Sequence, residues 1–328
     1  MKAFVSGAQG FIGRSMVAHL SRQGWQVAAM DLARPAGDPP PGVTFLTSDL
    51  RTPELWRAAL DGADVVIHLA SAHLQVDLPE SVYWETNVHS LRPLLEASLA
   101  AGVKHFVHTS SVGVHGSLAT VPGDEQSLVA PESLYERTKA AGEVEVLRFL
   151  PDAAPMGVTI VRPAWVYGPG DARTERILSA VARGRFIMFG AGRNQRHPIH
   201  IDDYVGGVER LLFQPQTFGR TYILAGPAYL TARELIRAAE QVTQGKARLR
   251  VPLALGYAAG LGAELAGRMV GVSPPISRRT LAFFMNRNAF DTARARREFG
   301  FAPSIGVVEG FQRVWVAMRG RTSCSSVQ

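Results

Sequence analysis

The chain opens with Lys2-Ala-Phe-Val-Ser-Gly7-Ala-Gln-Gly10-Phe-Ile-Gly13, in which an apolar run leads directly into three regularly spaced glycines. The run Lys2–Ser6 predicts a buried strand, and the apolar side chains after Gly10 recur at helical spacing. Between a strand and a helix, Gly7 permits a tight turn, Gly10 lets a ligand approach the backbone, and Gly13 lets the helix pack close to the strand. We therefore predict that the free N–H groups at the start of this helix bind a pyrophosphate.

Short apolar runs and helical patterns alternate through the first half of the chain. The predicted strands are Lys2–Ser6, Gln26–Met30, Val43–Thr47, Val65–Leu69, His105–Thr109 and Val158–Val161. The predicted helices are Ile12–Gln23, Glu54–Leu60, Pro79–Ala101 and Ser133–Leu150. Strands that are apolar along their whole length are typical of a sheet covered on both faces. The alternation therefore predicts an α/β fold with a doubly wound parallel sheet, the Rossmann fold.

The regular alternation ends after Tyr167-Gly-Pro-Gly170. The helices predicted beyond it are Ile177–Arg183, Asp203–Leu212, Ala232–Thr243, Leu253–Val270 and Ser304–Met318. We expect three parts: a dinucleotide-binding domain over residues 1–168, a smaller mixed α/β substrate-binding lobe over residues 169–320, and a flexible tail over residues 321–328. The boundary between the first two is not expected to be clean, because strands near residues 198–226 can rejoin the first sheet.

The bulk composition excludes several classes of protein. Of 328 residues, 46% are hydrophobic and 19% are charged, which is typical of a globular chain with a large core. The net charge of +7 comes from scattered arginines, without a dense basic block, so we expect no nucleic-acid partner. The only cysteine, Cys324, cannot form an internal disulfide, and the strand at residues 2–6 leaves no room for a signal peptide. Together these features predict a cytoplasmic protein.

The longest apolar segment, Val251–Val272, is interrupted by Glu264 and Arg268. A buried or pocket-lining helix fits this segment better than stable insertion into a membrane. Together with the apolar run Leu281–Met285, it suits a lipophilic substrate that binds through apolar area. The same residues fit equally well as the core of their own lobe.

Asp31 ends the second predicted strand, close to the spacing at which an acidic residue receives the hydroxyls of an adenosine ribose. A carboxylate there repels a 2′-phosphate, which favours NAD over NADP. Arg34 keeps NADP as the less favoured alternative. Alone, Asp31 is equally well explained as a turn residue, but the three glycines at this spacing favour the cofactor site.

A second motif is Ser133-Leu-Tyr-Glu-Arg-Thr-Lys139. Four residues make about one helical turn, so the side chains of Tyr135 and Lys139 project from the same face. A free tyrosine has a pKa near ~10, and a neighbouring ammonium favours the phenolate and is expected to lower that pKa toward neutrality. Alone, the spacing is weak evidence, because most such pairs line a solvated helix face.

With these motifs in order, the chain resembles the extended short-chain dehydrogenase/reductase family, also called the NAD-dependent epimerase/dehydratase type. Its C-terminal half resembles members related to 3β-hydroxysteroid dehydrogenases and dihydroflavonol reductases. The matching segments are Asp49-Leu50, His68-Leu-Ala70, Asn87-Val88, Thr109-Ser-Ser-Val-Gly-Val-His-Gly116, Arg162-Pro-Ala-Trp-Val-Tyr-Gly-Pro-Gly170 and His200-Ile-Asp-Asp203. The resemblance implies NAD as cofactor and a homodimer formed through the helices at Pro79–Ala101 and Ser133–Leu150.

The resemblance also implies the roles of individual residues. The catalytic residues would be Ser111, Tyr135 and Lys139, with Ser110 the neighbour most easily confused with Ser111. The cofactor-binding residues would be Gly7, Gly10, Phe11, Ile12, Gly13, Asp31, Asp49, Leu50, Leu69, Ala70, Asn87, Tyr135, Lys139 and Pro163. Asn87 fits equally well as a packing or helix-capping residue.

Two positions depart from the family pattern. His115 stands where a tyrosine is usual, and with no evident partner it is interpreted as a pocket-shaping difference. Trp165 stands where nucleotide-sugar epimerases carry an asparagine that binds the diphosphate, and an indole cannot accept hydrogen bonds. Arg193 and Arg196 could instead grip a diphosphate, so all four residues are candidate substrate contacts.

Histidines and acids elsewhere do not predict a metal site. His105 and His108 lie three apart on a predicted strand, and hence on opposite faces. His197 and His200 flank a strand, and the acidic pair at residues 202–203 is expected to cap the following helix.

These observations favour an NAD-dependent oxidoreductase that interconverts a secondary alcohol and a ketone on a hydrophobic small molecule, steroid-like or polyketide-like. The alternative is a nucleotide-sugar 4-epimerase or dehydratase that uses transient oxidation by bound NAD. A non-catalytic dinucleotide-binding sensor is a third hypothesis. It is disfavoured because Tyr135 and Lys139 are both present.

Overall fold

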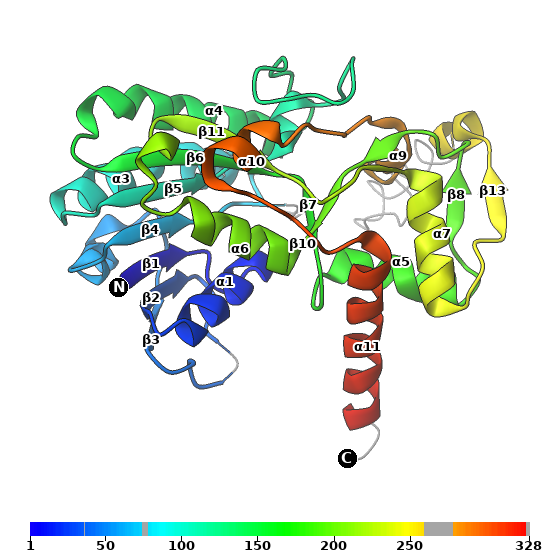
Figure 1. Ribbon diagram of the computed structural model, residues 1–328, viewed down its shortest axis with the longest axis horizontal. Coiled ribbons are helices and arrows are strands. Elements are labelled where there is room, and N and C mark those ends of the chain that lie inside the picture. Colours follow the sequence, from blue (N-terminus) through cyan, green and yellow to red (C-terminus); the bar gives the residue numbers. More distant parts are fainter. Residues whose placement is uncertain (36, 74–77, 259–277, 326–328) are drawn as a thin grey trace.

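The computed structural model of the protein describes residues 1–35, 37–73, 78–258 and 278–325. At its centre lies a parallel sheet of seven strands in the order β11-β6-β5-β4-β1-β2-β3 (Figure 1). The strands are β1 (Lys2–Ser6), β2 (Gln26–Asp31), β3 (Val43–Thr47), β4 (Val65–His68), β5 (His105–Thr109), β6 (Gly157–Pro163) and β11 (Arg220–Leu224). The strand order reverses between β1 and β4, and a doubly wound sheet binds ligands at the carboxyl ends of such strands.

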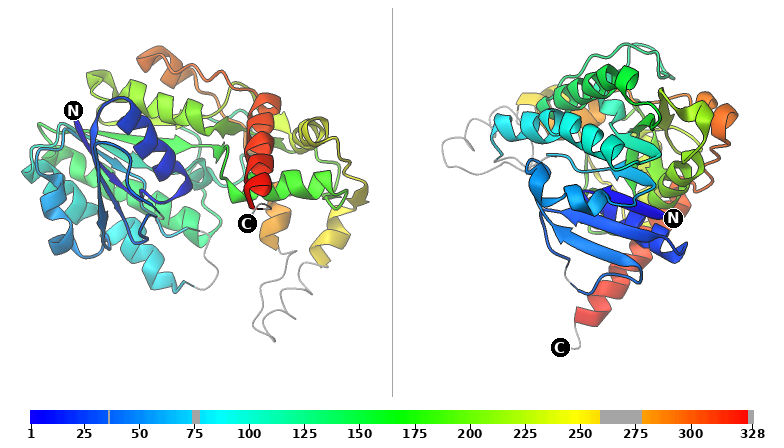
Figure 2. Two further views of the ribbon diagram at one scale, coloured as in Figure 1. Left: turned by 90° about the horizontal axis from the view of Figure 1, so that it is seen from below. Right: turned by 90° about the vertical axis from the view of Figure 1, so that its left-hand side faces the viewer.

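Helices cover both faces of this sheet (Figure 2). One face carries α1 (Phe11–Arg22) and α6 (Ile201–Leu211). The other face carries α2 (Glu80–Trp84), α3 (Leu91–Ala100) and α4 (Leu134–Phe149). Successive side chains of a strand point to opposite faces, so Val5 of β1 packs beneath α1 and its neighbour Phe4 packs beneath α3. The predicted doubly wound α/β fold is confirmed.

The predicted strands of the first half agree with the structure to within two residues at each end. The predicted helix Glu54–Leu60 is wrong. Two 3₁₀ turns, Pro53–Leu55 and Arg57–Leu60, lie there instead. Between them the fully buried Trp56 donates from its indole nitrogen to the carbonyl oxygen of Leu50 at 3.0 Å, which holds the segment in this irregular path.

The single helix predicted at Pro79–Ala101 is also divided. A π-helical turn, Glu85–His89, separates α2 from α3. Such a turn is typical of functional sites, because it turns a side chain away from the regular helix face. Here the side chain in the middle of the turn is Asn87.

A smaller lobe follows Pro163 and lies on the right of Figure 1. Its elements are β7 (Trp165–Tyr167), α5 (Ala172–Ala182), β8 (Ile187–Phe189), β9 (Gln195–Arg196), β10 (Pro198–His200), β12 (Leu230–Thr231), α7 (Ala232–Thr243), β13 (Leu249–Val251), α9 (Arg278–Met285) and α11 (Val307–Ser325). The short strands pair as β10 with β7, β12 with β9, and β13 with β8. Tyr167, Leu235 and Phe311 lie in its core. The helix α7 coincides with its predicted bounds, and Thr231 and Glu234 form a capping box at its start.

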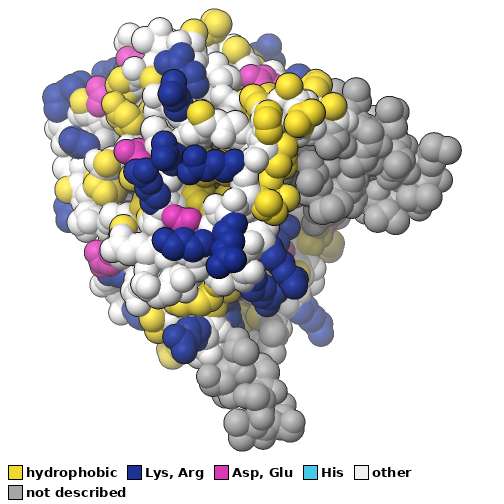
Figure 3. Space-filling view, turned by 90° about the vertical axis from the view of Figure 1, so that its right-hand side faces the viewer, with side chains coloured by type: hydrophobic (Ala, Val, Ile, Leu, Met, Phe, Trp, Pro, Cys, Tyr) yellow, Lys and Arg dark blue, Asp and Glu magenta, His cyan; other side chains and the backbone are white. Residues whose placement is uncertain are grey.

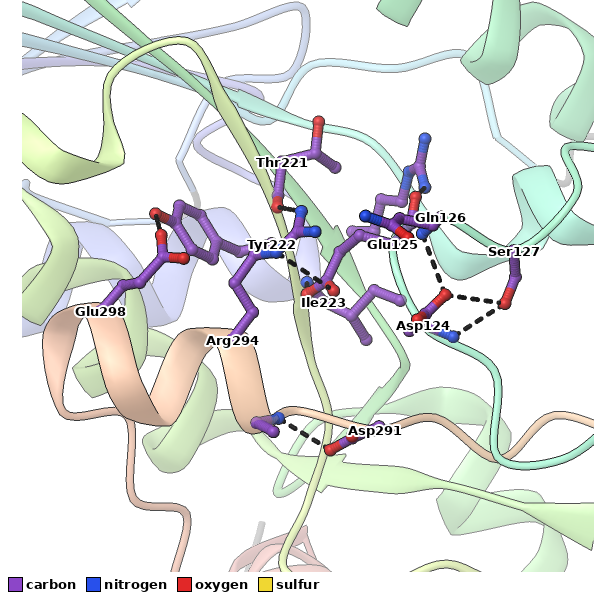
Figure 4. Close-up of polar contacts among 12 residues, drawn as sticks. Asp124, Glu125, Gln126, Ser127, Thr221, Tyr222, Ile223, Asp291, Arg294 and Glu298 are labelled. Carbon is purple, nitrogen blue, oxygen red and sulfur yellow. Dashed lines mark hydrogen bonds and ion pairs between the residues drawn. The ribbon is translucent and has the colours of Figure 1, made fainter.

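The chain returns to the first sheet at β11, which forms the sheet's edge beside β6. Figure 4 shows how this edge is covered. The carboxylate of Glu125 accepts a hydrogen bond from the backbone N–H of Ile223 at 3.0 Å. From α10 (Ala293–Phe299), Arg294 donates to the carbonyl oxygen of Thr221 at 3.2 Å, and nearby Glu298 accepts from the Tyr222 hydroxyl. An edge strand engaged in this way is not free to pair with another chain.

The remaining short helices are 3₁₀ turns at Val112–His115, Leu150–Asp152 and Pro215–Thr217. The helix α11 continues to Ser325, so the first residues of the predicted tail are helical. The predicted helix Leu253–Val270 lies outside the described residues from position 259 onward. Within the described residues, no helix combines the length and apolar character that crossing a bilayer requires.

Candidate active site

The glycine turn after β1 is shaped by contacts that exclude any side chain. Gly7 has a φ of 73°, and a Cβ atom there would lie 2.5 Å from the backbone nitrogen of Ala70. A Cβ at Gly13 would lie 2.0 Å from the carbonyl oxygen of Gly7. Gly10 caps α1 without a side-chain hydrogen bond, and the first turn of α1 holds no acidic residue. Phe11 and Ile12 are the first residues of α1. The turn therefore fits the pyrophosphate of a dinucleotide.

Asp31 connects the end of β2 to this turn. One oxygen of its carboxylate accepts from the backbone N–H of Gln9 at 2.8 Å, and the other accepts from Ala33 at 3.0 Å. The structure thus places the carboxylate at the lip of the glycine turn. Its predicted contact with the adenosine ribose stays a prediction.

Asp49 is partly exposed to solvent, whereas the side chain of its neighbour Leu50 is not. Arg51 hydrogen-bonds the Asp49 carboxylate at 2.6 Å, which holds the pKa of Asp49 below its usual value, and Arg51 also pairs with Glu85 at 2.8 Å. Leu50 is buried in the core. Both residues line a surface hollow of about 360 Å³ beside the π turn. Their predicted contact with the adenine stays a prediction.

Ser111 and Tyr135 come together at the carboxyl end of β5. The Tyr135 phenol lies close enough to the Ser111 side chain for Ser111 to influence its pKa, and the Ser111 oxygen accepts from the backbone N–H of Gly113 at 3.0 Å. The ring of His73 lies edge-on to the Tyr135 ring, with 4.6 Å between the centroids. Ser110 differs from Ser111, because its hydroxyl oxygen is buried and has no hydrogen-bond partner among the described residues. The geometry therefore distinguishes the two neighbouring serines.

The expected lowering of the Tyr135 pKa by Lys139 is wrong for this structure. Burial of the phenol raises the pKa of Tyr135 to about 12, against the opposing effect of the nearby Ser111 hydroxyl. The Lys139 ammonium donates to the carbonyl oxygen of Thr109 at 2.5 Å. Tyr135 is therefore protonated at neutral pH and ready to act as a proton donor.

Lys139 is itself buried, and burial lowers its pKa to about 8, while Glu143 one turn further along α4 raises it. The Glu143 carboxylate forms a two-point ion pair with Arg162, at 2.6 and 2.8 Å, and both side chains are buried. The sequence contained a signal for Glu143, because an acid four residues after Lys139 lies on the same helix face. Glu143 supports the charged form of Lys139.

His115 has partners, contrary to expectation. Its Nε2 lies 3.1 Å from a guanidinium nitrogen of Arg162, which can only donate, and its Nδ1 lies 3.1 Å from the carbonyl oxygen of Leu128. The tautomer with the proton on Nδ1 satisfies both bonds. Burial, then the Arg162 charge, lower the pKa of His115. Only 2% of His115 is exposed, so it braces Arg162 from inside the protein rather than lining an open pocket.

The side chain of Asn87 connects two segments that border the candidate site. Its side chain pairs with both backbone groups of Ala72, at 2.8 and 3.1 Å, and donates to the Thr138 hydroxyl at 2.9 Å. The π turn thus fastens the loop after β4 to α4, which carries the catalytic candidates. Pro163, the last residue of β6, is buried, while Leu69 and Ala70 pack against the glycine turn at Gly7.

Of the residues predicted to contact the substrate, the structure brings Trp165 and Arg196 close to the same aromatic ring, that of Phe283, but not Arg193. The guanidinium of Arg173 lies 4.7 Å from the Trp165 ring centre, and that of Arg196 lies 4.7 Å from the Phe283 ring centre. Burial, then the neighbouring Arg173 charge, lower the pKa of Arg196 to about 9. Arg193 is exposed and takes no part in these ring contacts. Phe283 lies in the apolar run Leu281–Met285 that the sequence had singled out, whereas the sequence offered no signal for Arg173, which meets Phe283 only through the fold.

The histidines behave as predicted on the sheet. His105 bonds to Thr159 at 2.9 Å on one face, whereas His108 stacks on His68 on the other face, with 5.5 Å between ring centres. No cluster of three or more metal-ligating side chains occurs in the described part of the chain.

The cap predicted for α6 is wrong. His200, rather than the acidic pair, caps this helix by accepting from the N–H of Asp202. Asp202 pairs with Arg313 at 2.9 Å, and Asp203 accepts from the backbone of Ile305. The acidic pair therefore fastens α6 to the segment that leads into α11.

Comparison with known proteins shows to which family this chain belongs. A sequence profile described as the NAD dependent epimerase/dehydratase family matches residues 3–225. A dTDP-glucose 4,6-dehydratase from Streptomyces griseus is 31% identical over 325 residues, covering 93% of this chain and 90% of that protein. A 2-alkyl-3-oxoalkanoate reductase from Stenotrophomonas maltophilia is 27% identical over 333 residues, covering 96% and 98% respectively.

Solved structures agree on the fold. The dTDP-glucose 4,6-dehydratase DesIV from Streptomyces venezuelae, solved with NAD and TYD bound, matches with a TM-score of 0.79 and 24% sequence identity. The match covers 99% of this chain and 98% of that one. With the profile spanning more than half of its length, this protein belongs to the NAD-dependent epimerase/dehydratase family of extended short-chain dehydrogenases/reductases, and it is an NAD-dependent enzyme.

Proposed function

We propose that this enzyme interconverts a secondary alcohol and a ketone on an apolar small molecule, with Tyr135 as the proton donor and acceptor. The observation that carries the proposal is the approach of the Tyr135 phenol to the Ser111 side chain, with the buried ammonium of Lys139 one helical turn further along α4 and bonded to the Thr109 carbonyl oxygen. Both hydroxyls lie at the carboxyl end of the sheet, on the side of the glycine turn. NAD, when bound, accepts or supplies the hydride.

In the direction of reduction, Tyr135 donates its proton to the substrate oxygen. A pKa of about 12 keeps that proton in place at neutral pH until charge develops on the substrate. The Ser111 hydroxyl, whose oxygen is held by the backbone N–H of Gly113, donates to the same substrate oxygen. The Lys139 ammonium stabilises the phenolate that remains, and Glu143 keeps that ammonium charged. In oxidation the same groups act in reverse.

The surroundings of Ser111 favour simple oxidation and reduction over dehydration. Removing water from the neighbouring carbon requires a further acid and base. The residues after Ser111 are Val112 and Gly113, neither of which titrates. The carboxylate that lies beside Gly113, that of Glu136, accepts from the backbone N–H groups of Glu132 and Ser133 and is occupied as a helix cap.

An apolar substrate is supported by the ring surfaces beyond the site. Trp165 and Phe283 meet edge to face, 6.0 Å apart. The indole occupies a position where a diphosphate-binding amide would be expected. Leu281 and Phe284, in contrast, belong to the lobe's core, so only part of the predicted apolar run is available to a ligand. A relative is named as a 2-alkyl-3-oxoalkanoate reductase, which is consistent with an apolar ketone.

One observation favours the second candidate, a nucleotide-sugar epimerase. Arg196 is 8% exposed and forms no ion pair with any described carboxylate, and the second guanidinium, Arg173, lies on the same aromatic pair. Two guanidinium groups that lie on the same pair of rings can hold a phosphate group. Relatives named as a dTDP-glucose 4,6-dehydratase and a UDP-glucose 4-epimerase agree with this candidate.

We also propose that the enzyme is a homodimer formed through α3 and α4. The support is the exposure of two large apolar side chains on α4, Val144 at 44% and Leu147 at 46%. Size-exclusion chromatography with light scattering tests this proposal, and V144E/L147E should then yield monomers.

The reaction is tested with a panel of apolar ketones and alcohols, UDP-sugars and dTDP-sugars, followed by nicotinamide absorbance and product analysis. Net cofactor turnover with an apolar ketone supports the leading proposal. Formation of a sugar epimer without net turnover supports the second candidate. Tyr135→Phe should abolish either activity and leave NAD binding intact, whereas Tyr229→Phe, at a tyrosine that is 48% exposed, is the matched control.

A further inference from the structure

The positive charge of this protein is concentrated in one part of its C-terminal lobe. Residues 172–196 and 232–258 hold eleven lysines and arginines but only three glutamates. This leaves 24 of the 35 basic and 25 of the 28 acidic residues for the rest of the chain, so these two segments account for the net charge of +7. The fold brings them together, because β8 pairs with β13 and α5 packs on α7. Figure 3 shows lysine and arginine side chains spread over this side of the molecule, with few acids among them.

Five of these cations form a group that we call the basic rim. Arg183 and Arg185 precede β8, Lys246 and Arg248 precede β13, and Arg250 lies on β13. The two turns lie side by side, since a Cβ at Gly184 would be 3.8 Å from the carbonyl oxygen of Lys246. All five side chains are exposed, and none of them forms an ion pair with another described residue.

The nearby acids are used inside the lobe and do not neutralise the basic rim. Glu175 pairs with Arg321, Glu234 caps α7, and Glu240 accepts from the backbone N–H of Ala247 at 2.8 Å. No acid occurs in residues 181–193 or 241–258. Among the residues that the structure describes, the basic rim therefore presents positive charge that no carboxylate pairs.

Large apolar side chains are exposed beside the basic rim. Leu249 is 54% exposed between Arg248 and Arg250, and Leu255 and Tyr257, just beyond β13, are 62% and 44% exposed. A surface that combines cations with exposed leucine and tyrosine side chains matches the boundary between lipid headgroups and acyl chains. Contacts with a nucleic-acid backbone would use the cations but leave the leucines in water.

We propose that the basic rim, with Leu249, Leu255 and Tyr257, docks this protein on the surface of an anionic phospholipid bilayer. The cations contact the lipid phosphates and the three apolar side chains enter the interface. No span of the membrane is involved. The proposal is independent of the reaction assigned to the active site.

Flotation of the full chain with lipid vesicles tests this proposal. We expect binding to vesicles of phosphatidylcholine with about one third phosphatidylglycerol, and little binding to phosphatidylcholine alone. Raising the salt from about 0.1 M to 1 M should release most of the protein, because the screening length falls from ~10 Å to ~3 Å. Equal binding to both vesicle types, or no binding to either, would overturn the proposal.

Variants separate the basic rim from the overall charge. R248Q/R250Q should weaken vesicle binding about 25-fold, since each cation near an anionic surface contributes about fivefold. The control R57Q/R220Q removes the same charge from exposed sites in the other half and should leave binding within about twofold. L255S/Y257S should weaken binding at high salt more than at low salt. An equal loss in the control, or displacement of the vesicles by a duplex oligonucleotide at equal phosphate, would contradict docking on lipid.

Discussion

The two halves of this molecule use charge in opposite ways. In the dinucleotide-binding half, the charged groups that surround the proposed catalytic residues are buried, as in the Glu143–Arg162 pair beneath Lys139. In the C-terminal lobe, the cations are many, and those of the basic rim are exposed and form no ion pair with another residue that the structure describes. The difference shows that one half uses charge to set the protonation of a single site, whereas the other leaves it available to an external partner. Substitutions in the first half should therefore change chemistry, and substitutions in the second half should change association.

The largest effect is expected at Tyr135. Phenylalanine lacks the hydroxyl group that would donate the proton to the substrate oxygen, so kcat should fall by about 10²- to 10⁴-fold. NAD binding, measured by calorimetry, should stay within about twofold, because the substitution leaves the glycine turn that fits the pyrophosphate unchanged. A variant that retains full activity would remove Tyr135 from the mechanism.

A smaller but still large effect is expected at the glycine turn. In Gly13→Ala, the new Cβ would lie 2.0 Å from the Gly7 carbonyl oxygen, so the turn must open and NAD affinity should fall by at least about tenfold. Gly206→Ala is the matched control, since no atom lies within 4 Å of the new Cβ on helix α6. This control should raise stability by about 0.5–1 kcal/mol and leave NAD binding unchanged. Isothermal calorimetry and thermal unfolding measure both.

The pH dependence of turnover should reveal how Glu143 acts. With the pKa of Lys139 at about 8, the ammonium is present below that pH, and activity should decline as the pH rises through it. Because Glu143 raises the pKa of Lys139, Glu143→Gln should move this decline to lower pH. A purely structural role would lower kcat at every pH without moving the profile.

The same substitution should reduce stability. Glu143→Gln leaves the buried Arg162 guanidinium without its carboxylate, which costs about 3–5 kcal/mol. E143Q/R162M should recover part of this loss, since both charges are then removed. Denaturant unfolding measures both variants at a pH where Lys139 is charged. If the single variant unfolds like the parent protein, the ion pair contributes little.

The smallest effect on chemistry is expected in the basic rim. R248Q/R250Q should keep kcat within about twofold on a water-soluble substrate and keep stability within about 0.5 kcal/mol, because both side chains are exposed. Steady-state kinetics and thermal unfolding of the same preparations used for flotation check this. A large loss of kcat would link the C-terminal lobe to the chemistry and weaken the contrast between the two halves.

The sequence predicts the sheet well, because strands covered on both faces are apolar throughout, as at β1 and β5. It does not predict the division of the helix at residues 85–89, because the bonds that require it reach from Asn87 to Ala72 across the fold. It also mistakes the distribution of charge. The arginines of residues 172–196 and 232–258 look dispersed along the chain and are gathered only when β8 and β13 pair. Short-range sequence patterns predict the individual helices and strands. The arrangement of the C-terminal lobe depends on contacts between distant segments, which such patterns do not contain.

The π turn at Glu85–His89 has a consequence for how the chain tolerates insertion and deletion. One residue corresponds to about 100° of rotation along an α-helix. Deleting a residue from this turn would yield a straight, regular helix, yet it would swing α2 about its axis relative to α3 and withdraw Asn87 from the loop after β4. A change that looks like a repair of helical geometry would therefore disconnect the loop after β4 from α4, so the irregular spacing is the part of this helix that is least free to vary.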